Sequence, residues 1–437
     1  MRIAMIGTGY VGLVSGACFA DFGHQVVCVD KDERKIAALH DNVMPIYEPG
    51  LDDLVARNVS EGRLSFTTQL GQAVRDADVI FIAVGTPARR GDGHSDLSYV
   101  YAAAREIATA VVRDTVVVTK STVPVGTGDE IERIVRDARP DIRIAVASNP
   151  EFLREGAAIN DFKRPDRVVV GTDNERAREA LQEVYRPLYL NAAPLLFASR
   201  RTAELIKYAA NAFLATKISF INEIADLCDA VGADVQQVAR GIGLDNRIGN
   251  KFLHAGPGFG GSCFPKDTLA LSRTAEEAGS PVTIVDTVIT VNEARKRSLA
   301  RRVIRTCDGS VRQKAIAVLG LTFKPNTDDM RDSPSLALIP ALQDAGASVR
   351  AHDPQGMPHA GALLSDVKFC DDPYQAADGA DALVIVTEWD AYRALDLDRI
   401  RQSMKTPIIV DLRNIYRPDE MSAKGFRYSS VGRPAQD

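Results

Sequence analysis

Short apolar segments alternate with segments of helical periodicity through the first 170 residues of the chain. Short runs of apolar and β-branched residues between turn residues are typical of buried strands. Their alternation with helical patterns predicts a parallel sheet wrapped by helices. The expected strands are Arg2–Ile6, Gln25–Asp30, Val79–Val84, Thr115–Thr119, Ile142–Ala147 and Val168–Val170.

The pattern changes near Arg200. From there apolar residues recur at helical spacing, and neither Gly nor Pro occurs before Gly232. We therefore expect one helix of roughly thirty residues, with further helices following it. This helical part is expected to span residues 200–305.

The end of the chain returns to the alternation of strands and helices. Ala315–Gly320, Ser348–Asp353 and Gly379–Val386 repeat the order of apolar runs found at the start. A repeated architecture and the preference of any α/β domain for Val and Ile explain this likeness equally well. Either way, the predicted fold class is α/β, with two Rossmann-like parallel-sheet domains, residues 1–199 and 306–437, joined by a long central helix and a helical region.

Composition narrows the function classes. Hydrophobic residues make up 45% of the 437 positions and charged residues 25%, which is typical of a globular protein. The formal net charge is −5, from 53 Lys and Arg against 58 Asp and Glu, and this balance argues against nucleic-acid binding. Because no apolar run approaches a membrane span and the amino terminus has no signal-peptide pattern, we expect a cytoplasmic protein.

The six cysteines are scattered and form no CxxC pair. Neither a metal site nor a disulfide framework is expected from this spacing. Cys18, Cys28 and Cys228 lie in apolar segments and are expected to be buried. Cys263 lies in a glycine-rich segment and does not fit that interpretation.

A glycine motif follows the first expected strand directly. Gly7, Gly9 and Gly12 form GxGxxG and open a helical pattern, an arrangement that allows close backbone approach to a pyrophosphate. Asp30 ends the second strand, where a carboxylate accepts a hydrogen bond from a ribose 2′-hydroxyl and repels a 2′-phosphate. The sequence therefore predicts an NAD site. The turns 85–87 and 120–122 follow later strands and should line the same cleft.

The segment Phe259–Asp267, FGGSCFPKD, carries the candidate nucleophile. We expect a helix to begin near Asp267, with Pro265 in its first turn. The positive end of the helix dipole and the nearby Lys266 would then both stabilise the reactive thiolate form of Cys263. A buried structural cysteine is the alternative.

Two further polar sets are candidates for chemistry. Glu204, Lys207 and Asn211 form a stripe at spacing i, i+3, i+7 on the long helix. A buried lysine there stabilises developing negative charge, and Asn211 can hold a hydroxyl. Glu151 and Glu155 lie four residues apart and would face one cleft if the turn is helical. An exposed helix face and ordinary solvated glutamates are the alternatives.

Over essentially its whole length the chain resembles the UDP-glucose/GDP-mannose dehydrogenase family. The matching motifs are GTGYVG, STVPVGT, NPEFLREG, ELIKYAAN, RIGNKFLHAGPGFGGSCFPKD and FKPNTDDMRDSPS, of which FGGSCFPKD is the most specific. The resemblance implies oxidation of a sugar C6 alcohol to a carboxylate with two NAD⁺. It favours the branch that converts UDP-glucose to UDP-glucuronate, with a related hexose (GDP-mannose or UDP-N-acetylhexosamine) as the alternative.

The resemblance also implies roles for individual residues. Cys263 would be the nucleophile, and Lys207 would stabilise oxyanions. The remaining residues with implied catalytic roles are Asn211, Asp267, Glu151 and Thr122. Those implied at the cofactor are Gly7, Gly9, Tyr10, Val11, Gly12, Asp30, Lys35, Thr86, Pro87, Ser121, Thr122, Glu155, Lys266 and Arg331. Those implied at the substrate are Glu151, Phe152, Leu153, Arg154, Glu155, Lys207, Asn211, Arg247, Phe252, Gly260, Cys263, Phe323 and Lys324.

By the same resemblance Arg247 would reach a substrate bound mainly to a neighbouring subunit, which implies a homodimer at least. Two other classes of function stay open at this point. One is a β-hydroxy-acid dehydrogenase that transfers a single hydride, and the other is a nucleotide-sugar-binding regulator without catalysis. Cys263 and its complete loop argue against both.

Overall fold

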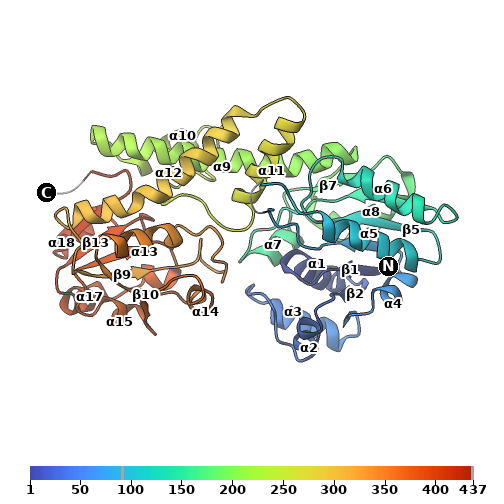
Figure 1. Ribbon diagram of the computed structural model, residues 1–437, viewed down its shortest axis with the longest axis horizontal. Coiled ribbons are helices and arrows are strands. Elements are labelled where there is room, and N and C mark those ends of the chain that lie inside the picture. Colours follow the sequence, from blue (N-terminus) through green and yellow to red (C-terminus); the bar gives the residue numbers. More distant parts are fainter. Residues whose placement is uncertain (90–92, 435–437) are drawn as a thin grey trace. The chain divides into compact units, whose positions relative to one another are not determined.

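The computed structural model describes residues 1–89 and 93–434 of the chain (Figure 1). It divides into two compact units. The first unit comprises Met1–Ala210 and Arg273–Ser280, and the second comprises Asn211–Ser272 and Pro281–Asp437.

The first unit is built on an eight-stranded sheet. Its strands are β1 (Arg2–Ile6), β2 (Gln25–Val29), β3 (Leu64–Thr67), β4 (Val79–Ile82), β5 (Thr115–Thr119), β6 (Ile144–Ser148), β7 (Val168–Gly171) and β8 (Leu195–Ala198). Its helices are α1 (Tyr10–Asp21), α2 (Glu33–His40), α3 (Leu51–Ser60), α4 (Leu70–Arg75), α5 (Ser98–Ala110), α6 (Thr127–Ala138), α7 (Ala158–Lys163), α8 (Glu175–Val184) and the 3₁₀ helix Arg186–Asn191. The strand order is β3-β2-β1-β4-β5-β6-β7-β8.

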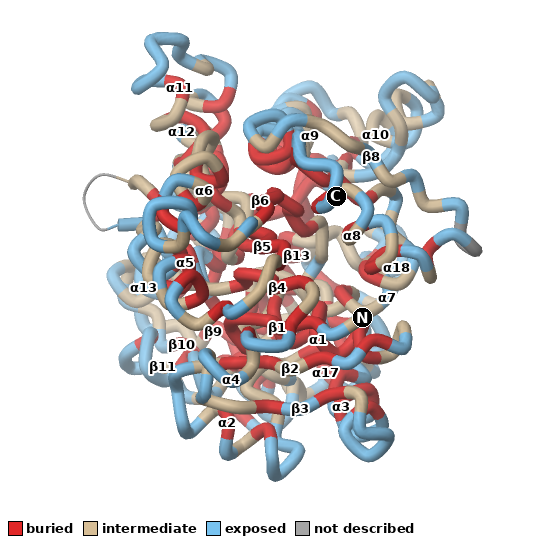
Figure 2. Tube along the Cα trace, turned by 90° about the vertical axis from the view of Figure 1, so that its right-hand side faces the viewer, coloured by how far each residue is buried: buried red, intermediate tan, exposed pale blue. Residues whose placement is uncertain are grey.

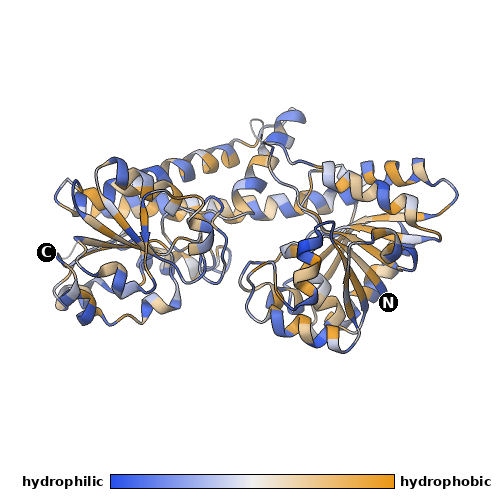
Figure 3. Ribbon diagram, turned by 60° about the horizontal axis from the view of Figure 1, so that its bottom comes forward, coloured by the Kyte–Doolittle hydropathy of each residue, from blue (hydrophilic) through white to orange (hydrophobic). Residues whose placement is uncertain are grey.

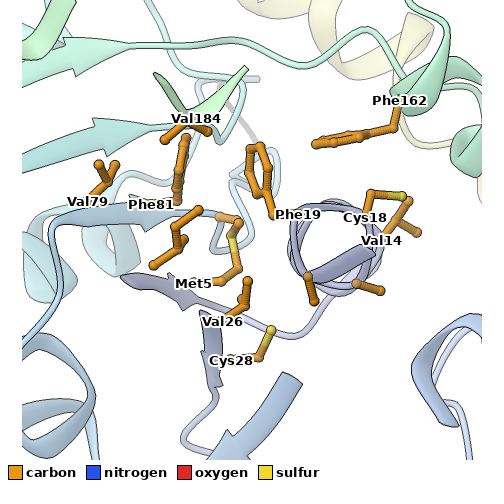
Figure 4. Packing of buried hydrophobic residues seen from close by; sticks show 14 of the residues in the cluster. Met5, Val14, Cys18, Phe19, Val26, Cys28, Val79, Phe81, Phe162 and Val184 are labelled. Atoms are coloured by element: carbon orange, nitrogen blue, oxygen red, sulfur yellow. The ribbon is translucent and has the colours of Figure 1, made fainter. Parts of the chain in front are cut away.

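Helices cover both faces of this sheet because successive strand side chains point to opposite faces. Ile3 and Met5 of β1 pack in the layer that contains α1, α3, α7 and α8, whereas Ala4 and Ile6 pack with α4, α5 and α6. In the first layer, the ring of Phe19 lies 5.1 Å from that of Phe81 (Figure 4). The apolar strands between more polar helix surfaces are visible in Figure 3.

The sheet differs from the prediction in two respects. Strands β3 and β8 were not predicted, since each is only four residues long with few fully buried positions. Strand β7 runs antiparallel to β6, and β8 is parallel to β7, so the sheet is not entirely parallel. An apolar run does not reveal the direction of its strand, which depends on the path of the connecting segment.

The second unit contains a six-stranded sheet in which every strand pair is parallel. Its strands are β9 (Ala315–Leu319), β10 (Ser348–His352), β11 (Val367–Phe369), β12 (Ala382–Ile385), β13 (Ile408–Asp411) and β14 (Arg427–Ser430). Its helices are α10 (Val235–Gly243), α12 (Thr283–Thr306), α13 (Ser335–Asp344), α14 (Met357–Ala360), α15 (Pro373–Ala377), α16 (Asp390–Arg393), α17 (Leu397–Ser403) and α18 (Pro418–Ala423). Two more helices, α9 (Arg200–Val231) and α11 (Phe264–Glu277), have residues in both units.

The predicted likeness between the two ends of the chain is confirmed in the strand order. The order β11-β10-β9-β12-β13-β14 repeats β3-β2-β1-β4-β5-β6 of the first unit. Asp30 and Asp353 each follow the second strand of their sheet, and each accepts hydrogen bonds from the turn after the first strand. In both units the strands form the buried centre, shown in red in Figure 2.

The long helix predicted from Arg200 is α9, which has 32 residues. In the second unit, α9 and α12 pack on one face of the six-stranded sheet, through side chains that include Ile221 and Val303, and α15–α18 cover the other face. Among the helices of residues 1–89 and 93–434, none has the length and apolar composition needed to cross a membrane.

Candidate active site

The glycine motif forms the turn between β1 and α1. A Cβ atom at Gly7 would lie 2.5 Å from the carbonyl oxygen of Ala83, and one at Gly12 would lie 2.0 Å from that of Gly7. Only glycine fits these two positions. Gly9 faces open space, and no side chain caps the backbone N–H groups of the 12-residue helix α1. This turn therefore fits a dinucleotide pyrophosphate.

Asp30 lies beside this turn. Its Oδ2 accepts hydrogen bonds from the backbone N–H and the hydroxyl of Thr8, at 2.9 and 2.8 Å, and lies 3.9 Å from Nζ of Lys35. Burial raises the pKa of the Asp30 carboxyl, but the Thr8 donors and the charge of Lys35 outweigh burial and lower it. The residue is therefore a carboxylate at neutral pH, as recognition of a ribose hydroxyl requires.

The turns after β4 and β5 are joined to each other. The hydroxyl of Thr86 donates to the backbone oxygen of Thr122 at 2.9 Å, and that of Ser121 donates to the backbone oxygen of Val84 at 2.7 Å. Because both turns follow the carboxyl ends of neighbouring parallel strands, the structure brings together the residues that the sequence predicted at one edge. Pro87 belongs to the first of these turns.

Lys207 and Glu151 form a buried ion pair. Nζ of Lys207, on α9, lies 2.9 Å from Oε1 of Glu151, which follows β6. The backbone N–H of Leu153 donates to the other carboxylate oxygen at 2.6 Å. Burial raises the pKa of Glu151, yet the charge of Lys207 and these hydrogen bonds lower it overall. The polar stripe on the long helix is thus buried, and the interpretation as an exposed face is wrong for Lys207.

Glu204, the first member of the stripe, binds backbone and hydroxyl groups of the first unit. Glu204 accepts hydrogen bonds from the backbone N–H groups of Gly126 and Gly128 and from the hydroxyl of Ser148. Burial raises the pKa of Glu204. The side chain thereby fixes the start of α6. Glu204 also lines a small cavity, together with Lys207. The other lining residues are Thr119, Ser121, Thr122, Val123, Ser148 and Pro150.

The condition under which Glu151 and Glu155 would face one cleft, a helical turn, is not met. Residues 151–154 adopt no helix, and the short helix α7 begins only at Ala158. The two glutamates therefore do not share one helix face.

Two other residues of this segment have charged neighbours. The side chain of Arg154 forms an ion pair with Asp161 at 2.6 Å. The ring of Phe152 lies under the guanidinium group of Arg167, and its centre is 5.4 Å from Nζ of Lys207.

Glu48, which was not among the predicted site residues, links the start of α1 to the backbone at Gly156 and Ala158. The hydroxyl of Tyr10 donates to Glu48. The carboxylate of Glu48 also accepts from the backbone N–H of Gly156 at 2.6 Å and of Ala158 at 2.7 Å. The hydroxyl of Tyr10 is therefore bound to Glu48. Burial and Glu48 are the main causes that raise the pKa of Tyr10, and the charge of Glu155, next to Gly156, is a smaller one.

Cys263 directly precedes α11. The helix begins at Phe264, three residues earlier than predicted, and the backbone N–H of Asp267 donates to the carbonyl oxygen of Cys263 at 2.8 Å. Cys263 is half-buried, whereas the other five cysteines are buried. Burial raises the pKa of the Cys18 and Cys28 thiols to about 12. The predicted contrast between Cys263 and Cys18, Cys28 and Cys228 is confirmed.

Asn211 and Asp267 are brought together in the second unit. Nδ2 of Asn211 donates to Oδ2 of Asp267 at 2.6 Å, and Nζ of Lys266 lies 3.0 Å from the other carboxylate oxygen. Asp267 is 1% exposed and Asn211 7% exposed. A buried carboxylate with a charged partner on one oxygen and an amide on the other has a fixed orientation.

The loop before Cys263 is held from two sides. Asn292 of α12 accepts from the backbone N–H of Phe259 at 2.8 Å and donates to its carbonyl oxygen at 3.0 Å. The backbone N–H of Gly261 donates to the carbonyl oxygen of Arg331 at 2.7 Å. A Cβ atom at Gly260 would meet the backbone of Asp332 at 2.3 Å. Asn292, another residue that the sequence analysis missed, thus fixes the backbone that carries the cysteine.

The other predicted substrate residues lie in the second unit. Phe323 packs against Gly261, and Nζ of Lys324 lies 5.3 Å from the ring of Phe323. Phe252 has a left-handed backbone, with φ of 64°, which is strained for an aromatic residue. Arg247 is exposed and paired with Asp245. Arg331, which the resemblance implied at the cofactor, also lies in this unit, where it is exposed and forms an ion pair with Asp329 at 2.7 Å.

No group of three or more His, Cys, Asp or Glu side chains within residues 1–89 and 93–434 is arranged to hold a metal ion.

Comparison with known proteins agrees with this geometry. Residues 1–189 match the NAD binding domain of the UDP-glucose/GDP-mannose dehydrogenase family, residues 201–294 match its central domain, and residues 317–418 match its UDP binding domain.

Individual relatives match over almost the entire chain. A UDP-glucose 6-dehydrogenase of Rhizobium meliloti (strain 1021) is 67% identical over 436 residues, which cover 99% of this chain and 100% of the relative. A UDP-glucose 6-dehydrogenase of Bacillus subtilis (strain 168) is 50% identical, covering 99% and 94%. The solved structure of a UDP-glucose dehydrogenase from Pyrobaculum islandicum is 41% identical with a TM-score of 0.90, covering 99% and 97%. The chain therefore belongs to the UDP-glucose/GDP-mannose dehydrogenase family and is an NAD-dependent oxidoreductase.

Proposed function

We propose that the protein oxidises the C6 alcohol of UDP-glucose to the carboxylate of UDP-glucuronate. The observation that carries the proposal is the half-buried Cys263 at the N-terminus of α11, beside the buried pair of Asn211 and Asp267. The relatives at 67% and 50% identity are UDP-glucose 6-dehydrogenases, which supports UDP-glucose over another nucleotide sugar.

The electron balance of this reaction requires two oxidations. The alcohol first loses a hydride and a proton and becomes an aldehyde. The Cys263 thiolate then adds to the aldehyde carbon while the carbonyl oxygen takes up a proton, and the resulting thiohemiacetal loses a second hydride and that proton to become a thioester. Addition of water breaks the carbon–sulfur bond and gives the carboxylate and the thiolate, with release of two protons. NAD⁺, when bound, accepts one hydride in each oxidation.

The residues of the first unit that would hold NAD are those of the glycine turn and Asp30. The backbone N–H groups from Gly9 onward would bind the pyrophosphate, and Asp30 would accept from the adenosine ribose with Lys35 beside it. Thr86, Pro87 and Ser121 would line the rest of the cofactor site. The carboxylate of Asp30 favours NAD over NADP because it repels a 2′-phosphate.

The charged residues then have distinct roles. Lys207 would stabilise the oxyanions that form at C6, since its ammonium group is buried and held in place by Glu151. Glu151 would exchange protons during hydrolysis of the thioester. Asn211 and Asp267 would position the substrate and water, and Thr122 would help hold that water.

We also propose that residues 1–199, 200–305 and 306–437 act as a cofactor domain, a helical dimerisation domain and a UDP-sugar domain. Phe213, Phe220 and Leu227 on α9 are spaced seven residues apart and are 66%, 50% and 55% exposed. An apolar stripe of this kind suits burial against a second copy of the helix. In such a dimer the exposed Arg247 would reach the substrate of the partner subunit.

The substrate is tested by measuring kcat/KM with NAD and each of UDP-glucose, GDP-mannose and a UDP-N-acetylhexosamine. We expect a preference for UDP-glucose of at least about tenfold, which corresponds to about 1.4 kcal/mol of transition-state stabilisation. A preference for one of the other sugars would assign the protein to that branch of the family. No NADH with any of them would contradict the proposed function.

A further inference from the structure

One side chain of α12 binds both backbone polar groups of a residue in the loop before the candidate nucleophile. Residues 253–263 form neither helix nor strand, so their buried backbone groups need partners from elsewhere. At Phe259 the partner is Asn292, whose Oδ1 accepts from the backbone N–H at 2.8 Å and whose Nδ2 donates to the carbonyl oxygen at 3.0 Å. Asn292 is 3% exposed and Phe259 6% exposed. The two hydrogen bonds are therefore shielded from water.

The residue before Phe259 is a glycine that makes this approach possible. Gly258 has φ of 105°, a conformation that L side chains rarely adopt. A Cβ atom at Gly258 would lie 2.8 Å from Oδ1 of Asn292. The loop therefore has a glycine where the side chain of α12 comes closest.

The ring of Phe259 continues the connection to the nucleophile. It meets the ring of Phe264 edge-on, with centres 5.9 Å apart and an angle of 89° between the ring planes. Phe264 is the first residue of α11 and directly follows Cys263. Val288, one turn before Asn292 on α12, packs in the same apolar cluster. Helix α12 thus holds Phe259 by its backbone and by its ring, and Phe259 contacts the residue next to the thiol.

We propose that Asn292 is a positioning residue for the reaction: by binding both backbone groups of Phe259, it keeps the Phe259 ring on Phe264 and so fixes Cys263 at the start of α11. Without Asn292 these backbone groups would turn toward water, because burying them unpaired is unfavourable. The ring would then leave Phe264, and the thiol would become more accessible. The proposal deepens the proposed function and rests on it, because Cys263 is the nucleophile there.

The test is the rate at which iodoacetamide alkylates each cysteine in Asn292→Ala and in the wild type, read by peptide mass spectrometry. Cys263 is half-buried in the wild type and should react at least about threefold faster in the variant, through local opening of the loop. Cys228 and Cys307 are buried in the same unit and should stay protected. In parallel, kcat with UDP-glucose and NAD should fall by at least about tenfold, because the nucleophile is displaced.

Two further variants sharpen the comparison. Asn292→Asp keeps the acceptor for the Phe259 N–H and loses the donor, so both effects should be smaller than in Asn292→Ala. Asn222→Ala is the matched control, since Asn222 of α9 accepts from the backbone N–H of Gly256 in the same loop at 2.8 Å. The guanidinium group of Arg295 still donates to the carbonyl oxygen of Gly256 at 2.6 Å in that control. Alkylation of Cys263 and turnover should therefore stay near the wild-type values.

A Cys263 thiol that reacts no faster in Asn292→Ala than in the wild type would overturn the proposal. Equal acceleration at Cys228 and Cys307, or failure of both Asn292 variants to fold, would assign Asn292 to stability and overturn it as well. Faster alkylation with unchanged turnover would remove Asn292 from the reaction. If the wild type makes no NADH from UDP-glucose, the proposed function falls, while the alkylation rates, which need no turnover, still decide whether Asn292 holds Cys263.

Discussion

The carboxylate of Glu151 and the ammonium group of Lys207 lie 2.9 Å apart with side chains that are 5% and 4% exposed. They come from segments 56 residues apart in the chain. A buried pair of this kind keeps both groups charged where water cannot screen them. It therefore supplies a fixed cation and a fixed proton acceptor at the edge of the first sheet.

Glu151→Gln should destabilise the protein by about 3 kcal/mol at neutral pH, because it leaves the buried charge of Lys207 without its partner. The folded-state pKa of Glu151 is lowered. The pair therefore contributes its full stability above the unfolded-state pKa, about 4.3, and loses it as the pH falls through the folded-state value. Urea unfolding of both proteins should show a difference that shrinks on acidification below about pH 4.

Asp161→Asn is the matched control for this prediction. It breaks the ion pair with Arg154, whose side chain is 62% exposed. Its cost should stay near or below about 1 kcal/mol. An equal cost for the two substitutions, or a Glu151→Gln difference that does not depend on pH, would contradict the account.

Asp30→Ala should narrow the preference for NAD over NADP, because it removes the repulsion of a 2′-phosphate. It should also lower kcat/KM with NAD, since Thr8 loses the acceptor of both its hydrogen bonds. The measurement is kcat/KM with each cofactor. Asp353→Ala removes the corresponding carboxylate of the second sheet and should leave the cofactor preference as it is. Equal kcat/KM values for NAD and NADP in the wild type would show that Asp30 does not select the cofactor.

Cys263→Ser should bind NAD and UDP-glucose but turn over slower by at least about a hundredfold, because a hydroxyl without an activating base is a weak nucleophile at neutral pH. Any ester that forms should hydrolyse slowly, so intact-protein mass spectrometry is the most direct search for a sugar adduct. Cys228→Ala, at a buried cysteine, is the control and should retain turnover. NADH production near the wild-type rate in Cys263→Ser would remove Cys263 from the mechanism.

Arg247→Ala and Cys263→Ala proteins should each be inactive alone and should regain part of the activity when mixed. The reason is that a hybrid dimer contains one site with both an intact cysteine and an intact partner arginine. Arg247 is 89% exposed and forms its ion pair with Asp245, only two residues away, so it is available to a partner. NADH formation is measured after subunit exchange has been verified. Absence of recovery after exchange would exclude a shared site.

Local patterns in the sequence predicted a large part of this molecule. The GxGxxG turn, Asp30 and the uninterrupted helix α9 were predictable because each depends on neighbouring residues or a single periodicity. The FGGSCFPKD segment also distinguished Cys263 from the buried cysteines, although α11 begins at Phe264, three residues before the predicted start near Asp267.

Pairs between distant segments could not be predicted in this way. The contacts of Asn211 with Asp267 and of Lys207 with Glu151 each join residues 56 positions apart. Lys120 resembles an ordinary polar residue at a strand end, yet it is buried among the rings of Phe81, Phe162 and Tyr185, which come from distant segments. The reversal of β7 was missed because an apolar run carries no information on direction.

The proposed function requires one protein to perform both oxidations at C6. Its most direct test is the number of NADH molecules formed for each UDP-glucose consumed, measured by absorbance of the nicotinamide and chromatography of the sugar nucleotide. We expect two NADH and one UDP-glucuronate per UDP-glucose, because a primary alcohol loses four electrons on its way to a carboxylate. One NADH per UDP-glucose with release of the aldehyde, or no NADH at all, would contradict it.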